Sequence, residues 1–328
     1  MLNSKYTILV MFAIILQSCI SEPQQKPTHK KPKVTVDVPS FNSDSAYYFI
    51  EKQVSFGPRV ISSIPWKDCA TWLEKKFLQY TPNVLVQEAP ITTYDGKNHT
   101  LKNIIASFSP DKNNRIALFA HWDSRHIADH DTENKNSPIL GANDGGSGVG
   151  VLLEMARQFS LKNPKIGVDI ILFDAEDYGQ PENSDYPIMQ DSWCLGSQHW
   201  SKNPHKSNYH ARYGILLDMV AAKNATFYWE GYSNYYASWV LKKVWDKAHI
   251  LGYGKQFRRE IVDPITDDHV PVNESSLGIP TIDIIEYDAS TENHFNKHWH
   301  THKDDMDNID RETLNAVGQT LLEVVYNE

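Results

Sequence analysis

Short apolar runs alternate with segments in which apolar residues recur every three or four positions, from about residue 43 to the end of the chain. The runs are typical of strands buried on both faces and lie at residues 83–87, 103–108, 115–121, 168–173, 214–217 and 281–285. The periodic segments predict helices at residues 43–54, 65–80, 148–159, 234–249, 270–277 and 311–326. Strands that alternate with helices predict an α/β fold. We expect a three-layer sandwich with helices on both faces of a central mixed, mainly parallel sheet.

The first nineteen residues follow a different pattern. Lys5 precedes an unbroken apolar run from Ile8 to Leu16, and small residues lead to Cys19. The run is shorter than the ~20 apolar residues of a membrane-spanning helix, and its flanks are typical of a secretory signal. Residues 16–19 also resemble the lipobox of bacterial lipoproteins, which implies cleavage before Cys19 and lipidation of its thiol. The alternative is an ordinary signal peptide in which this cysteine is incidental.

Three segments follow from these patterns. Residues 1–18 are expected to be a lipoprotein signal peptide, and residues 19–40 a lipidated cysteine followed by a flexible tether. Four prolines stand among polar residues in the tether, a composition that cannot bury a core. Residues 41–328 show no internal repeat and predict a single catalytic α/β domain. The exported protein would then be lipid-anchored in a bacterial envelope membrane, on its periplasmic or surface side.

Composition narrows the class of protein further. Of 328 residues, 41% are hydrophobic and 22% are charged, which is ordinary for a globular protein. The net charge is −9 although the first 33 residues are basic, so the rest of the chain is strongly acidic. An acidic body disfavours nucleic acid as a partner and suits a site in which carboxylates surround a cation. Beyond Cys19, two cysteines remain, Cys69 and Cys194, and their pairing is left open.

Acidic residues and histidines follow the predicted strands where each strand ends. They are His121, Glu176, Asp177 and Asp218, and Asp144 precedes a helix within a Gly-rich segment. The carboxyl ends of parallel strands meet at one edge of a sheet, so these side chains should lie together. The carboxylates of such a cluster would repel one another unless a cation neutralised them. A mixed set of oxygen and imidazole donors suits zinc. The chain lacks the sequence motifs of helical zinc proteases, serine hydrolases and phosphate-binding loops.

Six ordered motifs carry a family resemblance: residues 121–124, 141–145, 173–177, 217–218, 267–271 and 299–301. In this order they resemble the zinc aminopeptidase superfamily, over most of residues 44–326. Within it the chain is most similar to the glutaminyl-peptide cyclotransferases. An insertion that carries Trp193 precedes Gly196, and the doubled acid Asp267-Asp268 precedes His269, as in that family. The lipoprotein start indicates a bacterial member related to the animal enzymes.

The resemblance implies a reaction and a set of metal ligands. Asp144, Asp177 and His300 are expected to bind one zinc ion per chain, with the fourth position open to water or substrate. The substrates would be peptides or proteins that begin with glutamine. Their own α-amine attacks the side-chain carbonyl, which zinc polarises, so that ammonia leaves and pyroglutamate remains. The substrate supplies the nucleophile, which agrees with the absence of a serine or cysteine nucleophile motif.

The resemblance also implies roles for five further residues. Glu176 would transfer the proton from the attacking amine to the leaving nitrogen, with Asp218 and Asp267 around it. Trp193 and Trp299 would wall a small pocket for the glutamyl side chain. Two positions depart from the animal pattern. Asp177 stands where those enzymes carry a longer glutamate, and Thr266 stands where they carry glutamine.

Two alternative functions remain open from the sequence. In a two-zinc aminopeptidase, His121 and Asp218 would hold a second zinc, Asp144 would bridge the two ions, and Glu176 would activate a water molecule. A noncatalytic binding protein would have no use for this set of acids. Carboxylates that gather without a metal ion cost free energy, so the sequence argues against a noncatalytic binding protein.

Overall fold

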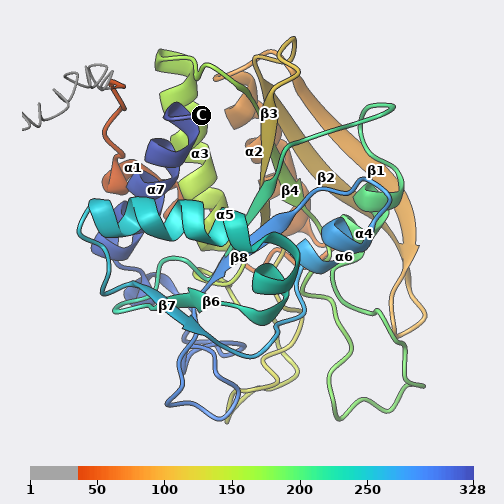
Figure 1. Ribbon diagram of the computed structural model, residues 1–328. Helices are drawn as coiled ribbons and strands as arrows, with labels where there is room; N and C mark the ends of the chain where they lie inside the picture. Colours follow the sequence, from red (N-terminus) through yellow and green to blue (C-terminus); the bar gives the residue numbers. More distant parts are fainter. Residues whose placement is uncertain (1–35) are drawn as a thin grey trace, which may run out of the picture. The chain divides into compact units, whose positions relative to one another are not determined.

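A six-stranded sheet forms the centre of the structure (Figure 1). The computed structural model describes residues 36–328. The strand order is β1-β2-β4-β3-β5-β8, with antiparallel pairing of β1 with β2 and of β2 with β4, and parallel pairing elsewhere. The bounds are β1 (Val84–Thr92), β2 (Asn98–Phe108), β3 (Arg115–His121), β4 (Gly167–Phe173), β5 (Gly214–Asp218) and β8 (Thr281–Ile285). All six predicted strands are confirmed, and the β1–β2 hairpin extends further than the apolar pattern indicated.

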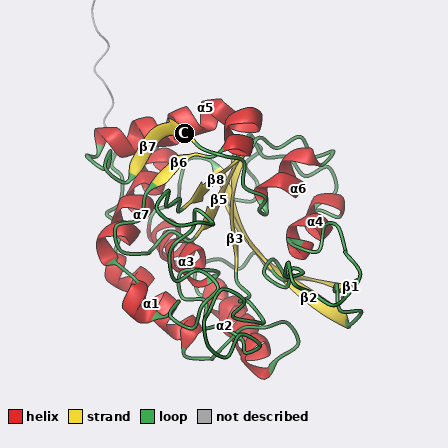
Figure 2. Ribbon diagram, turned by 90° about the horizontal axis from the view of Figure 1, so that it is seen from below, coloured by secondary structure: helices red, strands yellow, loops and turns green. Residues whose placement is uncertain are grey.

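Helices cover both faces of this sheet (Figure 2). One face carries α1 (Ser43–Val54), α2 (Ile64–Leu78), α3 (Gly146–Leu161), α5 (Gly231–Ile250) and α7 (Arg311–Tyr326), and the other carries α4 (Leu195–Lys202) and α6 (His269–Glu274). Strand β3 shows why both faces are buried. Its residues Ile116 and Leu118 enter the larger core, and Ala117 and Phe119 enter the smaller one. The predicted three-layer sandwich is confirmed.

Several short elements have no counterpart in the predicted pattern. Strands β6 (Phe227–Trp229) and β7 (Phe257–Ile261) pair in parallel as a separate two-stranded sheet, and a 3-10 turn covers Met306–Asn308. Most of β7 is exposed, so it lacks an apolar run. Helix α4 has only eight residues, too few for a helical period to stand out. Local sequence therefore predicted the large buried elements and missed the small ones.

The end of the predicted tether contacts the folded body. Phe41 is buried, Gln319 of α7 donates a hydrogen bond to the Pro39 carbonyl, and Lys162 donates one to Asp37. The remainder of the predicted tether, the predicted signal peptide and Cys19 lie outside the described residues. Within residues 36–328, no helix combines the length and apolar character that crossing a membrane requires.

The chain connections place a crevice at the carboxyl edge of the sheet. From β3 the chain passes through α3 on one face to reach β4, and then through α4 on the other face to reach β5. Since β4 and β5 flank β3 on opposite sides, the strand order reverses there. In open α/β sheets ligands bind at such a reversal, beyond the carboxyl ends of the strands.

Candidate metal and catalytic site

The structure brings the predicted site residues together at this edge. Each comes from the end of a strand, the start of a helix or an adjoining loop: His121 ends β3, Asp144 precedes α3, Glu176 and Asp177 follow β4, Asp218 ends β5, Asp267 precedes α6, and His300 lies beyond β8. The fold of a parallel sheet thus gathers residues from six separate segments. Five of these residues form two clusters that share Asp144.

The first cluster, which we call the open cluster, consists of Asp144, Asp177 and His300. One donor atom from each residue lies within 4.8 Å of the others, and all three side chains are buried. His300 Nε2 is 3.3 Å from Asp177 Oδ1 and 3.7 Å from Asp144 Oδ2. Neither Asp177 carboxylate oxygen has a hydrogen-bond donor among the described residues 36–328. Burial and the Asp144 charge raise the pKa of Asp177 to about 6.

These observations fit a bound zinc ion. A buried carboxylate without a partner is costly, and a cation between the three side chains would remove that cost. Two carboxylates and one imidazole are ordinary zinc donors and leave a coordination position for a ligand. Asp177 therefore reaches the cluster although its side chain is shorter than the glutamate of the animal enzymes.

The second cluster, the closed cluster, consists of His121, Asp144 and Asp218. Their donor atoms also lie within 4.8 Å of one another. Here, however, His121 Nε2 lies 3.1 Å from both Asp218 Oδ1 and Asp144 Oδ1. Burial lowers the pKa of His121, but its contacts with Asp123, Asp144 and Asp218 outweigh burial and raise it well above the usual value. The imidazole thus joins the two carboxylates directly.

Two buried carboxylates hold the backbone that presents the ligands. The Asp123 carboxylate accepts hydrogen bonds from the backbone amides of Glu176 and Asp177, both at 3.1 Å. The Asp304 carboxylate accepts from the amides of Asn143 and Asp144, at 2.8 and 3.0 Å. Each of these carboxylates, which we call a clamp, fixes the backbone of two successive residues. The side chains of those residues are therefore held in place before any ligand binds.

A further pair of residues supports His300. Its Nδ1 lies 3.0 Å from Asp129 Oδ1, and Arg125 holds the other Asp129 oxygen at 2.6 Å. Arg125 also donates a hydrogen bond to the backbone carbonyl of Asp177. It therefore contacts both Asp129, which lies against His300, and the backbone of Asp177. Such outer contacts orient metal ligands. Sequence reasoning missed Asp129, Arg125 and Asp304, because Asp304 stands within an acidic run and Asp129 in a polar loop without a pattern.

Glu176 lies beside the open cluster without being one of its donors. Its Oε1 accepts a hydrogen bond from the Cys194 thiol at 3.4 Å, and its Oε2 is 3.9 Å from His121 Nδ1. Burial raises its pKa well above the usual value, and the charges of Asp267 and Asp177 add to this, against the opposing effect of His121. Burial also raises the pKa of Asp218 to about 7. A carboxyl group whose pKa is raised holds its proton more readily, which suits a role as a proton donor.

A cavity of about 200 Å³ opens above these groups. Both predicted tryptophans line it, together with the apolar residues Met219, Ile265, Ile285 and Phe295, which sequence reasoning did not single out. The Trp299 ring stacks on His300 with 3.6 Å between ring centroids, and the Trp193 ring is nearly parallel to His300 at 6.0 Å. Apolar walls around buried carboxyl groups exclude water and strengthen electrostatic interactions.

Strained backbone surrounds the site. Ala175, Cys194, Met219 and His300 have φ angles of 54°, 57°, 49° and 55°, in the left-handed region that non-glycine residues rarely adopt. Such conformations cost free energy and gather at functional sites, where surrounding contacts maintain them. Cys194 and Cys69 are both buried free thiols. The pairing that the sequence left open is therefore not formed, and Cys194 contacts Glu176 instead.

A carboxylate and imidazole cluster at the carboxyl edge of an α/β sheet defines a metal-dependent enzyme. The model of peptidase family M28 matches residues 103–325, and the chain belongs to that family. Among its relatives, the bovine glutaminyl-peptide cyclotransferase is 26% identical over 259 residues, which cover 68% of this chain. The chain spans only 64% of that protein's length.

Two solved structures are similar over most of the chain. Tannerella forsythia glutaminyl cyclase is 53% identical, with a TM-score of 0.86, covering 88% of this chain and 100% of the other. A Zn-dependent exopeptidase from Parabacteroides distasonis is 52% identical, with a TM-score of 0.87, covering 89% of this chain and 100% of the other. The predicted resemblance to glutaminyl cyclases within the zinc aminopeptidase superfamily is thus confirmed. The Zn-dependent relative and the M28 family model indicate zinc as the metal of this enzyme class.

Proposed function

We propose that this protein is a zinc-dependent glutaminyl-peptide cyclotransferase, an acyltransferase that converts N-terminal glutamine to pyroglutamate and releases ammonia. The observation that carries the proposal is one open cluster beside Glu176 in a small cavity walled by tryptophans. A cavity of about 200 Å³ suits one residue at the end of a chain. The similarity to the Tannerella forsythia cyclase supports the same activity.

Asp144, Asp177 and His300 would hold one zinc ion per chain. When bound, zinc polarises the side-chain carbonyl of the substrate and stabilises the negative charge that develops on its oxygen. Asp129 holds the His300 ring in place, and the Asp304 clamp holds the backbone of Asp144. The protein therefore supplies a rigid set of donors, which is the usual requirement for selective metal binding.

The reaction balances with Glu176 as the only proton carrier. The neutral α-amine of the substrate attacks its own side-chain amide carbon, so a C–N bond forms within the ring. Glu176 accepts a proton from that nitrogen and donates it to the amide nitrogen, whose bond to carbon then breaks. Ammonia leaves, and the enzyme returns to its starting state. Glu176 accepts the proton as a carboxylate and donates it as the acid, and burial, which raises the pKa of this carboxyl, makes the carboxylate a stronger base.

The remaining predicted residues would serve Glu176 and the substrate. Asp218 and Asp267 both line the cavity, and an oxygen of Asp267 lies within 4.8 Å of Glu176 and of Cys194. The negative charge of Asp267 favours protonated Glu176, which is the form that must give its proton to the leaving nitrogen. Trp193 and Trp299 would flank the glutamyl side chain and keep it folded back on its amine.

A two-zinc aminopeptidase is the second candidate. The closed cluster has donor atoms close enough for a second ion, which His121 and Asp218 would hold with Asp144 as a bridge. The Parabacteroides distasonis relative, a Zn-dependent exopeptidase, favours this function. Against it stands the hydrogen bond between His121 Nε2 and Asp218, with Asp144 Oδ1 also 3.1 Å away, because this imidazole nitrogen already has a carboxylate partner.

Mass spectrometry of a glutamine-initiated peptide separates the two activities. A cyclase removes ammonia and leaves the number of residues unchanged, whereas an aminopeptidase shortens the peptide. The same peptide with an acetylated N-terminus is the control, because it has no free amine to attack. Shortening of the free peptide, without loss of ammonia from the intact chain, would refute the cyclase proposal.

We further propose that Cys19 is the lipidated first residue of the exported protein and anchors it to a bacterial envelope membrane. The support is the apolar run that ends at Leu16, followed by Gln17 and the small residue Ser18 directly before Cys19. In cells that express the full chain, Cys19→Ala should move the protein from the membrane fraction to the soluble fraction or block removal of the signal. Fractionation and migration equal to those of the parent would contradict anchorage.

A further inference from the structure

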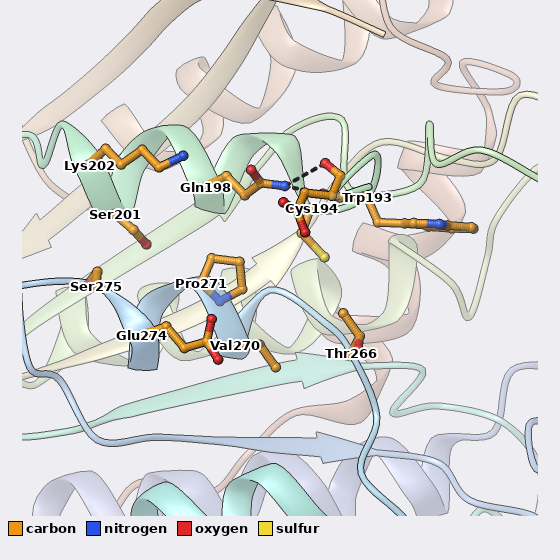
Figure 3. Close-up of a pocket in the computed structure, with 11 residues that line it drawn as sticks. Trp193, Cys194, Gln198, Ser201, Lys202, Thr266, Val270, Pro271, Glu274 and Ser275 are labelled. Carbon is orange, nitrogen blue, oxygen red and sulfur yellow. Dashed lines mark hydrogen bonds between the residues drawn. The ribbon is translucent and has the colours of Figure 1, made fainter. Parts of the chain in front are cut away.

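A second cavity lies between α4 and α6 (Figure 3). Its volume is about 400 Å³, twice that of the cavity above the open cluster. Cavities that hold small ligands usually measure ~300–1,000 Å³, so this one can accept a group of its own. No step of the proposed reaction uses it.

The two cavities meet at shared walls. Trp193 and Thr266 line both of them. Cys194 lines the second cavity, while its sulfur lies 3.4 Å from a Glu176 oxygen in the first. The first cavity is too small for more than the terminal residue, so a peptide must leave it after that residue. The second cavity begins where such a chain would emerge.

The walls of the second cavity combine apolar and polar groups. Val270 and Pro271 of α6 face Ser201 of α4 across the gap (Figure 3). Ser201 is only 4% exposed, and its hydroxyl has no hydrogen-bond partner in the part of the chain that the structure describes. A buried hydroxyl without a partner is costly, which indicates that a ligand group pairs with it. Exposed Asp191, Lys202 and Glu274 add three charged groups to the lining.

The geometry points to a binding subsite for the residue that follows the N-terminal glutamine of the substrate, an inference that rests on the proposed cyclase activity. The side chain of this second residue lies between α4 and α6, along Val270 and Pro271. A polar end reaches the Ser201 hydroxyl or the three charged groups. Long side chains fill the subsite, and glycine leaves it empty.

Steady-state kinetics on short amides test the subsite. Glutamine amide occupies only the first cavity, whereas Gln-Leu amide places a side chain in the second. Ser201→Leu fills the second cavity and should lower the ratio of kcat/KM for Gln-Leu amide to that for glutamine amide by about 10-fold, the scale of a blocked apolar contact. Ser160→Leu makes the same change at an exposed position of α3 and should keep the parent ratio.

A surface charge reversal provides a second test that does not disturb the core. Glu274→Lys should shift the preference between Gln-Lys amide and Gln-Glu amide about 2- to 5-fold toward Gln-Glu amide, as expected for an exposed ion pair. Glu51→Lys on the exposed side of α1 is the matched control.

The outcomes separate the subsite from the activity. A parent protein that releases no ammonia from any of these amides contradicts the proposed function. A parent that cyclises all of them, with ratios that neither Ser201→Leu nor Glu274→Lys changes, contradicts the subsite alone. If Ser201→Leu does not fold, the ratio measured for Glu274→Lys alone decides whether the subsite exists.

Discussion

The open and closed clusters contain the same kinds of side chain and share Asp144, yet their hydrogen bonding differs. In the closed cluster, His121 Nε2 lies 3.1 Å from a carboxylate oxygen on either side. In the open cluster, both Asp177 oxygens lack a hydrogen-bond donor within residues 36–328, and His300 is turned toward them from Asp129. The closed cluster thus contains a histidine hydrogen-bonded to Asp218, whereas the Asp177 carboxylate of the open cluster has no hydrogen bond in the described residues.

This difference shows why a count of carboxylates does not give a count of metal ions. Both clusters meet the distance requirement of a metal site. What separates them is the pairing of the carboxylates: Asp218 is hydrogen-bonded to His121, whereas Asp177 has no donor within residues 36–328, and an unpaired buried carboxylate costs free energy. For this reason the proposed function places its one zinc ion at Asp177 and His300 together with Asp144.

The largest expected effect is the loss of a ligand from the open cluster. His300→Ala should remove zinc during dialysis and bring cyclisation below detection, because the charge stabilisation from the metal is worth several kcal/mol. Metal analysis and an ammonia-release assay measure both. His298→Ala, two residues earlier in the same loop, should retain zinc and activity. Equal zinc content in the two variants would contradict the ligand assignment.

The next effect separates chemistry from metal binding. Glu176→Gln keeps the size of the side chain but cannot carry a proton, and kcat should fall by ~10³–10⁴-fold with zinc still bound. The loss should appear in kcat far more than in KM, since proton transfer belongs to the transition state. Exposed Glu182→Gln, in the loop between β4 and α4, is the control. If Glu176→Gln retains more than about a tenth of the parent kcat, another carboxyl carries the proton.

A smaller effect is expected from the support of the open cluster. Asp129→Asn keeps the shape but removes the negative charge beside His300, and zinc affinity should fall by ~10–100-fold, as for other residues that orient metal ligands. Competition with a zinc chelator measures the change. Asp111→Asn, on an exposed turn remote from the site, should leave the affinity unchanged. An unchanged affinity in Asp129→Asn would mean that this contact does not orient the ligand.

The smallest effect probes the closed cluster. Asp218→Asn weakens the bond to His121, and kcat should fall by about 10-fold, the lower end for a hydrogen bond to a charged group. Zinc should remain at one ion per chain, because Asp218 is not a ligand of the open cluster. If the parent binds two zinc ions and Asp218→Asn loses one of them, the closed cluster is also a metal site. That result would establish the aminopeptidase arrangement.

Local pattern and motif order predicted much of the fold and the identities of the site residues. Strands such as β3 and β8 could be predicted to the residue because both of their faces are buried and their sequences are mostly apolar. The short helix α4 and the exposed strand β7 could not, since neither has a clear period. Helix α4 matters for function, because it forms one wall of the second cavity.

By itself the sequence determined the layered α/β fold and the gathering of His121, Glu176, Asp177 and Asp218 at one sheet edge, because parallel strands end on the same side. Only the tertiary structure decided which atoms meet. Asp129 supports His300 from a loop far away in the chain, and this pairing depends on how the two loops pack. The periodicity of apolar residues indicates which residues are buried. Whether a buried carboxylate accepts hydrogen bonds depends on donors from segments far away in the chain. The difference between an open and a closed cluster is therefore a property of the folded chain.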